Sequence, residues 1–536
     1  MAAEALYGYD ANKDPLQTPG QTYSGIINPT ILTTGNRHAS KFTPTEAEKF
    51  VGQWEVVEHL SDTSTGFSGT LFKALKDDPA QGIVKDQLVL SFRSTEFIDD
   101  SARDNQATNK MELAEGGWAM GQIADMEDWY ASLKTSGKIP AGSSLSVTGY
   151  SLGGHLATAF NLLHPGEAAS TYTFNGAGVG TVNAGESLRA VVDRFNLQRK
   201  NADGNQIVFS DPAAQSIYNV LRAKFSDGSL PNAADISNLD YQIYAGTISM
   251  TDGDLLSKAL TRIKTIGEEI ARLTTLTSGI SVPGEPTYPA RIPAENIAAT
   301  RLDYQLAVLV AQKSTQAKDI LVSAALGLRN TVNPPLANFY DVYGATYPSV
   351  TATSQLHYGI ATPIFIEDQP LYRGKELTEA AKASLYAAFD AKGLVDDYTH
   401  NDFGDTHSLV LLIDSLNIQN TLATLDPTVT SGALDALLKA ASAAKRDSVI
   451  NTQGQCEGDV LENVLNGLCQ IVMGSKAPEK LVGSLVGNTW ADPASFVEKL
   501  YANLEALTDV SPTSDSTFKD LIGKITVSPA RRQSKS

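Results

Sequence analysis

A short apolar strand, a glycine-rich turn and an apolar helix follow one another without a gap in the middle of the first half of the chain. The strand is predicted at 145–149, the turn places Ser151 between Gly149 and Gly153, and a helix is predicted over 153–163. Gly-x-Ser-x-Gly alone arises easily by chance in a long chain, so the flanking strand and helix matter most. Together they predict a sharp strand-to-helix turn with a serine at its tip.

Other strands and helices alternate on both sides of this turn. A buried strand is predicted at 87–94, an amphipathic helix at 117–134 and a further strand at 170–175. The order strand, helix, strand, helix, strand predicts an α/β fold with a mostly parallel sheet.

Helical patterns dominate the next part of the chain, before strand patterns return at 337–343 and 361–367. Two of its helices are expected at 255–273 and 295–329, with a Pro- and Gly-rich joint at 282–293 between them. Further helices are expected near 408–424, 432–446, 458–472 and 495–508. The predicted organisation is the first part of an α/β core (1–180), a helical insertion (181–335), the second part of the core (336–410) and a helical C-terminal region (411–536).

The chain carries 60 acidic against 42 basic residues, a formal net charge of −18 at pH 7. Such an acidic surface repels phosphate backbones, so we expect no nucleic-acid partner. No run of 18 apolar residues predicts a transmembrane segment, and the first residues lack the pattern of a signal peptide. We expect a soluble protein; its localisation stays open, including secretion without an N-terminal signal. Cys456 and Cys469 are the only cysteines. They form either a disulfide or two separate thiols, and no function is assigned to them.

A serine raised above a sheet edge by such a turn is the arrangement of a nucleophile elbow. The start of the following helix points backbone N–H groups at the site, where the amide of Leu152 can stabilise an oxyanion. A nucleophilic serine needs a base, and the usual base is a histidine held by a carboxylate. His38 and His59 precede Ser151, whereas the chain order for this fold is serine, acid, histidine. His155 and His164 lie on the helix that leads away from the turn. Three histidines remain as candidate bases: His357, His400 and His407.

Three blocks of the chain together resemble the class 3 (triacylglycerol) lipases of the α/β-hydrolase superfamily. The blocks are TGYSLGGHLA, with LVLSFRSTEFIDD before it and YTFNGAGVG after it. The resemblance covers about 85–180 and, more loosely, 336–410. Two positions depart from the family pattern: Tyr150 replaces a usual histidine and Ser94 a usual glycine.

The resemblance implies roles for individual residues. Asp341, in NFYDVYG, corresponds to the catalytic acid, and His407, in GDTHSLVLLIDSL, to the catalytic base. His357 corresponds to a non-catalytic histidine of the family and is kept as the alternative base, ahead of His400. The second oxyanion donor falls on Thr95. The acid is less firmly fixed than the serine, because several aspartates, interpreted as a solvated acidic loop, precede His407: Asp396, Asp397, Asp402 and Asp405.

These roles predict an ester hydrolase that works through an acyl-enzyme on Ser151. The resemblance favours a lipid ester, as a triacylglycerol lipase, with a phospholipase A1 or a general carboxylesterase as alternatives. A hydrolase-fold interaction module without activity is the alternative from another class. Two segments are candidates for a lid over the acyl site: 96–116 and the insertion at 181–335. No cofactor is required, no metal ligand is assigned, and a structural calcium is left open.

Overall fold

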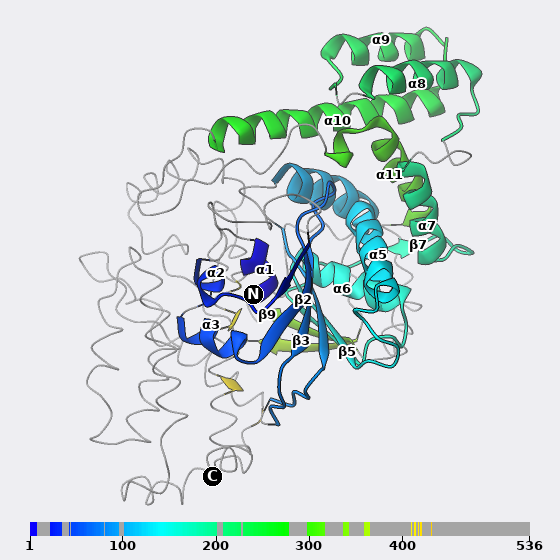
Figure 1. Ribbon diagram of the computed structural model, residues 1–536. Coiled ribbons are helices and arrows are strands. Elements are labelled where there is room, and N and C mark those ends of the chain that lie inside the picture. Colours follow the sequence, from blue (N-terminus) through cyan, green and yellow to red (C-terminus); the bar gives the residue numbers. More distant parts are fainter. Residues whose placement is uncertain are drawn as a thin grey trace, which may run out of the picture.

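The computed structural model describes residues 1–7, 22–34, 42, 44–79, 81–95, 101–200, 207–226, 229–277, 297–316, 336–341 and 359–364, with scattered positions between 409 and 430. These residues form an α/β protein with a mixed β-sheet at its centre (Figure 1). Among the described residues, no helix has the length and apolar character needed to cross a bilayer.

The central sheet contains eight described strands in the order β1-β2-β3-β4-β5-β6-β9-β10. Their bounds are β1 (Thr22–Gly25), β2 (Trp54–Leu60), β3 (Gly69–Ala74), β4 (Leu88–Phe92), β5 (Leu145–Tyr150), β6 (Ser170–Phe174), β9 (Leu336–Asp341) and β10 (Ile360–Ile364). A separate two-stranded ribbon pairs β7 (Thr181–Val182) with β8 (Thr315–Gln316).

Helices surround the sheet and fill the interval between β6 and β9. Those before β5 are α1 (Ala2–Tyr7), α2 (Pro29–Thr34), α3 (Pro44–Val51), the π-helix η2 (Ser101–Leu113), α4 (Ala114–Gly116) and α5 (Met120–Thr135). Those after β5 are α6 (Leu152–Leu163), α7 (Leu188–Arg199), α8 (Pro212–Phe225), α9 (Ala233–Tyr244), α10 (Met250–Thr277), the 3-10 turn η3 (Ala298–Thr300) and α11 (Leu302–Lys313).

The half of the sheet from β4 to β10 is parallel, as the alternating strand and helix patterns predict. The helix α5 connects β4 to β5, and α6 connects β5 to β6. All five strands therefore point the same way, and their C-terminal ends meet at one edge of the sheet.

The other half of the sheet, from β1 to β4, is antiparallel and was not foreseen from the sequence. Side chains alternate between the two faces along these strands. Leu71 of β3 and Leu90 of β4 join the large core cluster, whereas the next residue in β3, Phe72, joins a second cluster with α1, α2 and α3. The sheet is thus a middle layer, with α1–α3 on one face and α5 and α6 on the other (Figure 1).

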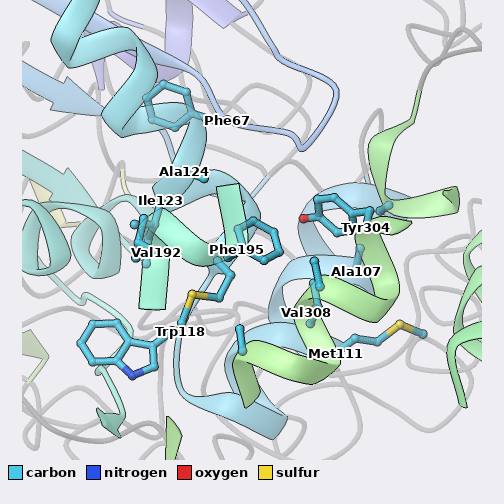
Figure 2. Close-up of a cluster of buried hydrophobic side chains, with 14 of the residues drawn as sticks. Phe67, Ala107, Met111, Trp118, Ile123, Ala124, Val192, Phe195, Tyr304 and Val308 are labelled. Carbon is cyan, nitrogen blue, oxygen red and sulfur yellow. The ribbon is translucent and has the colours of Figure 1, made fainter. Parts of the chain in front are cut away.

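The large core is continuous between the sheet domain and the helical insertion. Figure 2 shows Ile123 of α5 and Met111 of η2 in one cluster with Phe195 of α7 and Tyr304 of α11. All four side chains are at most 7% exposed. The expected boundary at residue 181 therefore separates two segments that share one hydrophobic core.

The first lid candidate is not a surface loop in its described part, residues 101–116. It forms η2 and α4, and α10 packs against it. Some of its charged side chains are buried: Arg103 contacts Asp62, and Asp104 accepts a hydrogen bond from Gln122 Nε2 at 2.7 Å. Lys110 and Glu115 are exposed. Part of the polar composition of this segment therefore reflects an internal ion network.

Several predicted helices need correction or lie outside the described residues. The helix expected at 295–329 is shorter, because α11 ends at Lys313 and the chain then pairs as β8. In the helix expected at 408–424, the described positions are helical. The other three C-terminal helices fall outside the described residues.

Glu112 of η2 joins the insertion to the sheet domain. Its carboxyl is 1% exposed, accepts a hydrogen bond from the Tyr304 hydroxyl at 2.5 Å and accepts another from the Gly121 N–H at 2.9 Å. A Cβ at Gly121 would lie 1.8 Å from the Tyr304 oxygen, so only glycine admits this hydroxyl. Burial raises the pKa of Glu112 to about 7, although both hydrogen bonds and the positive charges of Arg262 and Arg199 act in the opposite direction.

This pKa makes stability depend on pH. The folded state binds the Glu112 proton more tightly than the unfolded chain, so the contribution of Glu112 to stability is complete below about pH 4.5 and is lost as the pH rises to about 7. Between pH 5 and pH 8 we expect the free energy of unfolding to fall by about 2–3 kcal/mol more in the wild type than in Glu112→Gln. Urea titrations at both pH values measure this difference. Glu268→Gln, an exposed change on α10, serves as the control, and equal pH dependence in wild type and Glu112→Gln would contradict the assignment.

Candidate functional site

Ser151 lies at the tip of the turn between β5 and α6, at the C-terminal edge of the parallel strands. Its backbone has φ 53° and ψ −120°, which is strained for a residue with a Cβ. Such strain persists only where the surroundings impose it, and it concentrates at functional sites. The conformation is therefore the first structural sign that this serine has a role beyond the turn itself.

Three glycines allow this turn to form. A Cβ at Gly149 would lie 1.9 Å from the Gly153 oxygen, and a Cβ at Gly153 would lie 2.2 Å from the Phe92 oxygen. A Cβ at Gly154 would lie 2.6 Å from the Cα of Gly176. Each of these contacts is with backbone, which has no room to move aside. The spacing of glycines in the motif is thus a packing requirement of β4, β5 and α6.

Two backbone hydrogen bonds attach the turn to the end of β6. The Ser151 N–H donates to the Phe174 oxygen at 3.0 Å, and the Ser151 carbonyl accepts from the Ala177 N–H at 3.0 Å. The backbone of Ser151 is consequently held at both its N–H and its carbonyl oxygen. Its side chain is neither fully buried nor fully exposed.

Asp341 is the last residue of β9, at the same edge of the sheet as Ser151. Tyr150 of β5 is in register with Phe174 of β6, which is in register with Phe339 of β9. Ser151 follows this row by one residue and Asp341 by two. Two strand spacings separate them, or about 10 Å.

The proposed oxyanion donors flank the serine. Leu152 is the first residue of α6, where an amide has no acceptor within its own helix, and its side chain is 1% exposed. Thr95 follows β4, the strand next to β5, and its Oγ1 accepts a hydrogen bond from Asn109 Nδ2 at 2.9 Å. Both positions therefore lie at the edge of the sheet where Ser151 emerges.

His155 is engaged by backbone groups and is not available as a base. Its Nδ1 is 2.9 Å from the Gly178 oxygen, and its Nε2 accepts from the Ala119 N–H at 3.1 Å. Burial lowers its pKa to about 4, so the ring is neutral and its Nδ1 carries the proton that Gly178 accepts. This agrees with its exclusion on sequence grounds. His164 is likewise occupied, by Glu127 and Glu167.

His357, His400 and His407 lie outside the described residues, so the choice among them stays a prediction. Two described features of their surroundings are informative. Leu409 and Leu412 are buried in a cluster with Tyr150, the residue before Ser151. The strand that follows His357 in the sequence, β10, begins at the edge of the sheet opposite to Ser151.

Two polar residues near the site were not singled out from the sequence. Asn109 belongs to the segment 96–116, which the sequence indicates only as a lid candidate, and no sequence signal distinguishes this residue. Glu4 is buried, with 4% exposure, and its carboxylate accepts a hydrogen bond from the Ser94 N–H. In the sequence, the one indication of a buried carboxylate is that Glu4 is a single acidic residue among the alanines of α1.

Within the described residues, no group of three or more histidine, cysteine, aspartate or glutamate side chains is arranged to hold a metal ion. Comparison with models of protein families, with curated proteins and with solved structures gives no match for this chain. Function is therefore inferred from the geometry of the turn, the register of the sheet and the residues of the motifs.

The steric role of Gly153 is testable. Gly153→Ala places a methyl group against the backbone of Phe92 and Arg93, so we expect a loss of about 3 kcal/mol or more in the free energy of unfolding. Gly267→Ala is the matched comparison, since Gly267 is also a helical glycine, on α10, but the atoms nearest to its added Cβ belong to the exposed Leu230 side chain, which can move aside, so a change within about 1 kcal/mol is expected. Urea denaturation measures both. Equal changes in the two variants would contradict the steric role of Gly153.

Proposed function

We propose that this chain is a serine hydrolase of carboxylic esters, with Ser151 as the nucleophile. The observation that carries the proposal is the strained backbone of Ser151 at the C-terminal edge of the sheet, between a parallel strand and a helix N-terminus. This is the geometry of a nucleophile elbow, in which the serine hydroxyl projects above the sheet. The strand order, with one strand between those that carry Ser151 and Asp341, supports the same interpretation.

In the proposed reaction, the Ser151 oxygen attacks the ester carbonyl carbon while the imidazole of His407 takes the hydroxyl proton. Asp341 orients the imidazole and stabilises its positive charge. The amides of Leu152 and Thr95 bind the oxyanion of the tetrahedral intermediate. The intermediate collapses when the alcohol leaves with the proton from His407. Water, deprotonated by the same histidine, then cleaves the acyl-enzyme and restores Ser151.

We favour His407 over His357 as the base because of the described residues that follow each of them. Leu409 belongs to a buried cluster against which Tyr150, the residue before Ser151, packs. The residues after His357 begin β10 at the far edge of the sheet, away from Ser151. A base must come within hydrogen-bonding distance of the hydroxyl that it deprotonates.

We propose a lipid ester as the substrate class, on the resemblance to class 3 lipases. The described part of the family's lid region, residues 101–116, lies beneath α10, so the helical insertion is the better candidate for a cover over the acyl site. A phospholipid or a small ester is the alternative substrate.

The nucleophile is tested by covalent labelling. A fluorophosphonate probe is expected to label the wild-type protein and not Ser151→Ala, because the probe phosphorus bonds only to an activated serine oxygen. Ser146→Ala, a change on the preceding strand, should keep the label. Labelling that persists in Ser151→Ala, or no labelling of the wild type, would refute the serine hydrolase proposal. The labelled protein should also hydrolyse esters, and a series of increasing acyl length distinguishes a lipase from a small-ester esterase.

The base is tested by two histidine variants. His407→Ala should lower kcat by at least about 10⁴-fold, since removal of a triad member leaves only the oxyanion hole and binding to act. His357→Ala should retain turnover within about tenfold of the wild type. Initial rates with a chromogenic ester measure both. The reverse order of the two effects would transfer the role to His357.

A further inference from the structure

The Glu4 carboxylate holds both polar groups of Ser94. The Ser94 N–H donates to Oε1 at 2.7 Å, and the Ser94 hydroxyl donates to Oε2 at 3.0 Å. Two hydrogen bonds to one planar carboxylate fix the backbone and the side-chain rotamer of Ser94 together. Ser94 precedes Thr95, the proposed oxyanion donor, by one residue.

The position of Glu4 is energetically expensive. The carboxyl lies on α1 among the apolar residues Ala3, Ala5 and Leu6, and it is 4% exposed. Burial raises the pKa of Glu4, and the positive charges of the Met1 amino group and of Arg93, together with the Ser94 donors, counteract part of that effect. Burying a carboxylate costs several kcal/mol unless partners compensate it, so an apolar side chain would anchor α1 at lower cost. The two hydrogen bonds from Ser94 are therefore part of what compensates the burial of Glu4.

The segment that Glu4 holds is in contact with the nucleophile turn. Phe92 is in register with Gly149 of β5. The Phe92 and Arg93 oxygens lie so close to Gly153 that a Cβ there would be 2.2 Å and 2.9 Å from them. Residues 92–95 thus run between the start of α6 and the Glu4 side chain.

Thr95 is held from a different element. Its hydroxyl oxygen accepts from Asn109 of η2, whereas Ser94 is held by Glu4 of α1. The Asn109 contact fixes only the Thr95 side chain. The Thr95 amide belongs to the peptide unit that begins at the Ser94 carbonyl, so its position depends on how Ser94 is held.

We propose that Glu4 is a positioning residue for the oxyanion-binding loop: its carboxylate fixes Ser94 and so aims the Thr95 amide at the oxyanion formed on Ser151. This inference rests on the proposed serine hydrolase function. Oxyanion donors act through pre-organisation, and the loss of one donor costs about 10²–10³-fold in kcat. Weaker positioning of a donor that remains present should cost less.

The test compares Glu4→Gln with Glu48→Gln, the same change on an exposed residue of α3. Gln keeps the shape of Glu4 but can accept only one of the two hydrogen bonds from Ser94. Rates are divided by the concentration of Ser151 that a fluorophosphonate titrates, so that a smaller amount of folded protein does not lower the measured kcat. Glu4→Gln should lower kcat by about 10–100-fold and leave KM within about twofold, since the oxyanion forms only in the transition state. Glu48→Gln should leave both unchanged.

A double-mutant cycle identifies the path of the effect. In a Ser94→Ala background, Glu4→Gln should lower kcat by a smaller factor than in the wild type, because one of its two partners is already gone. Wild-type kcat in Glu4→Gln, or equal factors in the two backgrounds, would overturn the positioning role.

The proposed function and the positioning role fail separately. If the wild type shows no turnover that depends on Ser151, the hydrolase proposal fails and with it the oxyanion role of Glu4. If Ser151-dependent turnover is present, only the kinetics of Glu4→Gln and the hydrogen exchange of the Ser94 amide decide about Glu4. Faster exchange of that amide in Glu4→Gln than in Glu48→Gln supports the positioning role, and unchanged exchange contradicts it.

Discussion

The close approach of α6 to the backbones of β4 and β6 is the contact on which the rest of the site depends. Gly153 and Gly154 bring the start of the helix to the Phe92 oxygen and to Gly176 without an intervening side chain. The helix N-terminus therefore points its first amides at the edge of the sheet where the strands end. The same approach leaves Ser151 no relaxed backbone conformation, because the chain must reverse direction within one residue.

From this contact the positions of the other groups follow. Residues 92–95 are placed beside the serine because they touch Gly153. Asp341 is placed by the pairing of β9 with β6, which is itself paired with β5. The proposed nucleophile, acid and oxyanion loop thus follow three strands with a fixed spacing, which explains how one edge of a sheet brings together residues that are far apart in the chain.

Local patterns were sufficient to predict the parallel half of the fold. The strand and helix around Ser151 appear as β5 and α6, and the helix expected at 117–134 appears as α5. In each of these elements, the spacing of the apolar residues along the local sequence is enough to indicate a strand or a helix. The candidate residues Ser151, Leu152, Thr95 and Asp341 lie at one edge of the sheet, while His407 stays a prediction.

What the sequence did not disclose depends on partners distant in the chain. The segment 101–113 looks like a polar loop, yet Arg103 and Asp104 are buried because the turn after β2 and the helix α5 supply their partners, Asp62 and Gln122. Glu4 is similar, since its partner Ser94 is 90 residues away. A period of 2 or 3.6 residues carries no information about such pairs, so buried ion networks escape this kind of prediction.

The pairing of β6 with β9 has a kinetic consequence. Roughly 160 residues separate Phe174 from Leu336, and all of them must be gathered before these strands can meet. Contacts that distant form slowly, whereas β5, α6 and β6 are close in sequence. The turn that carries Ser151 should therefore be structured before Asp341 reaches it, so the proposed site would be completed only late in folding.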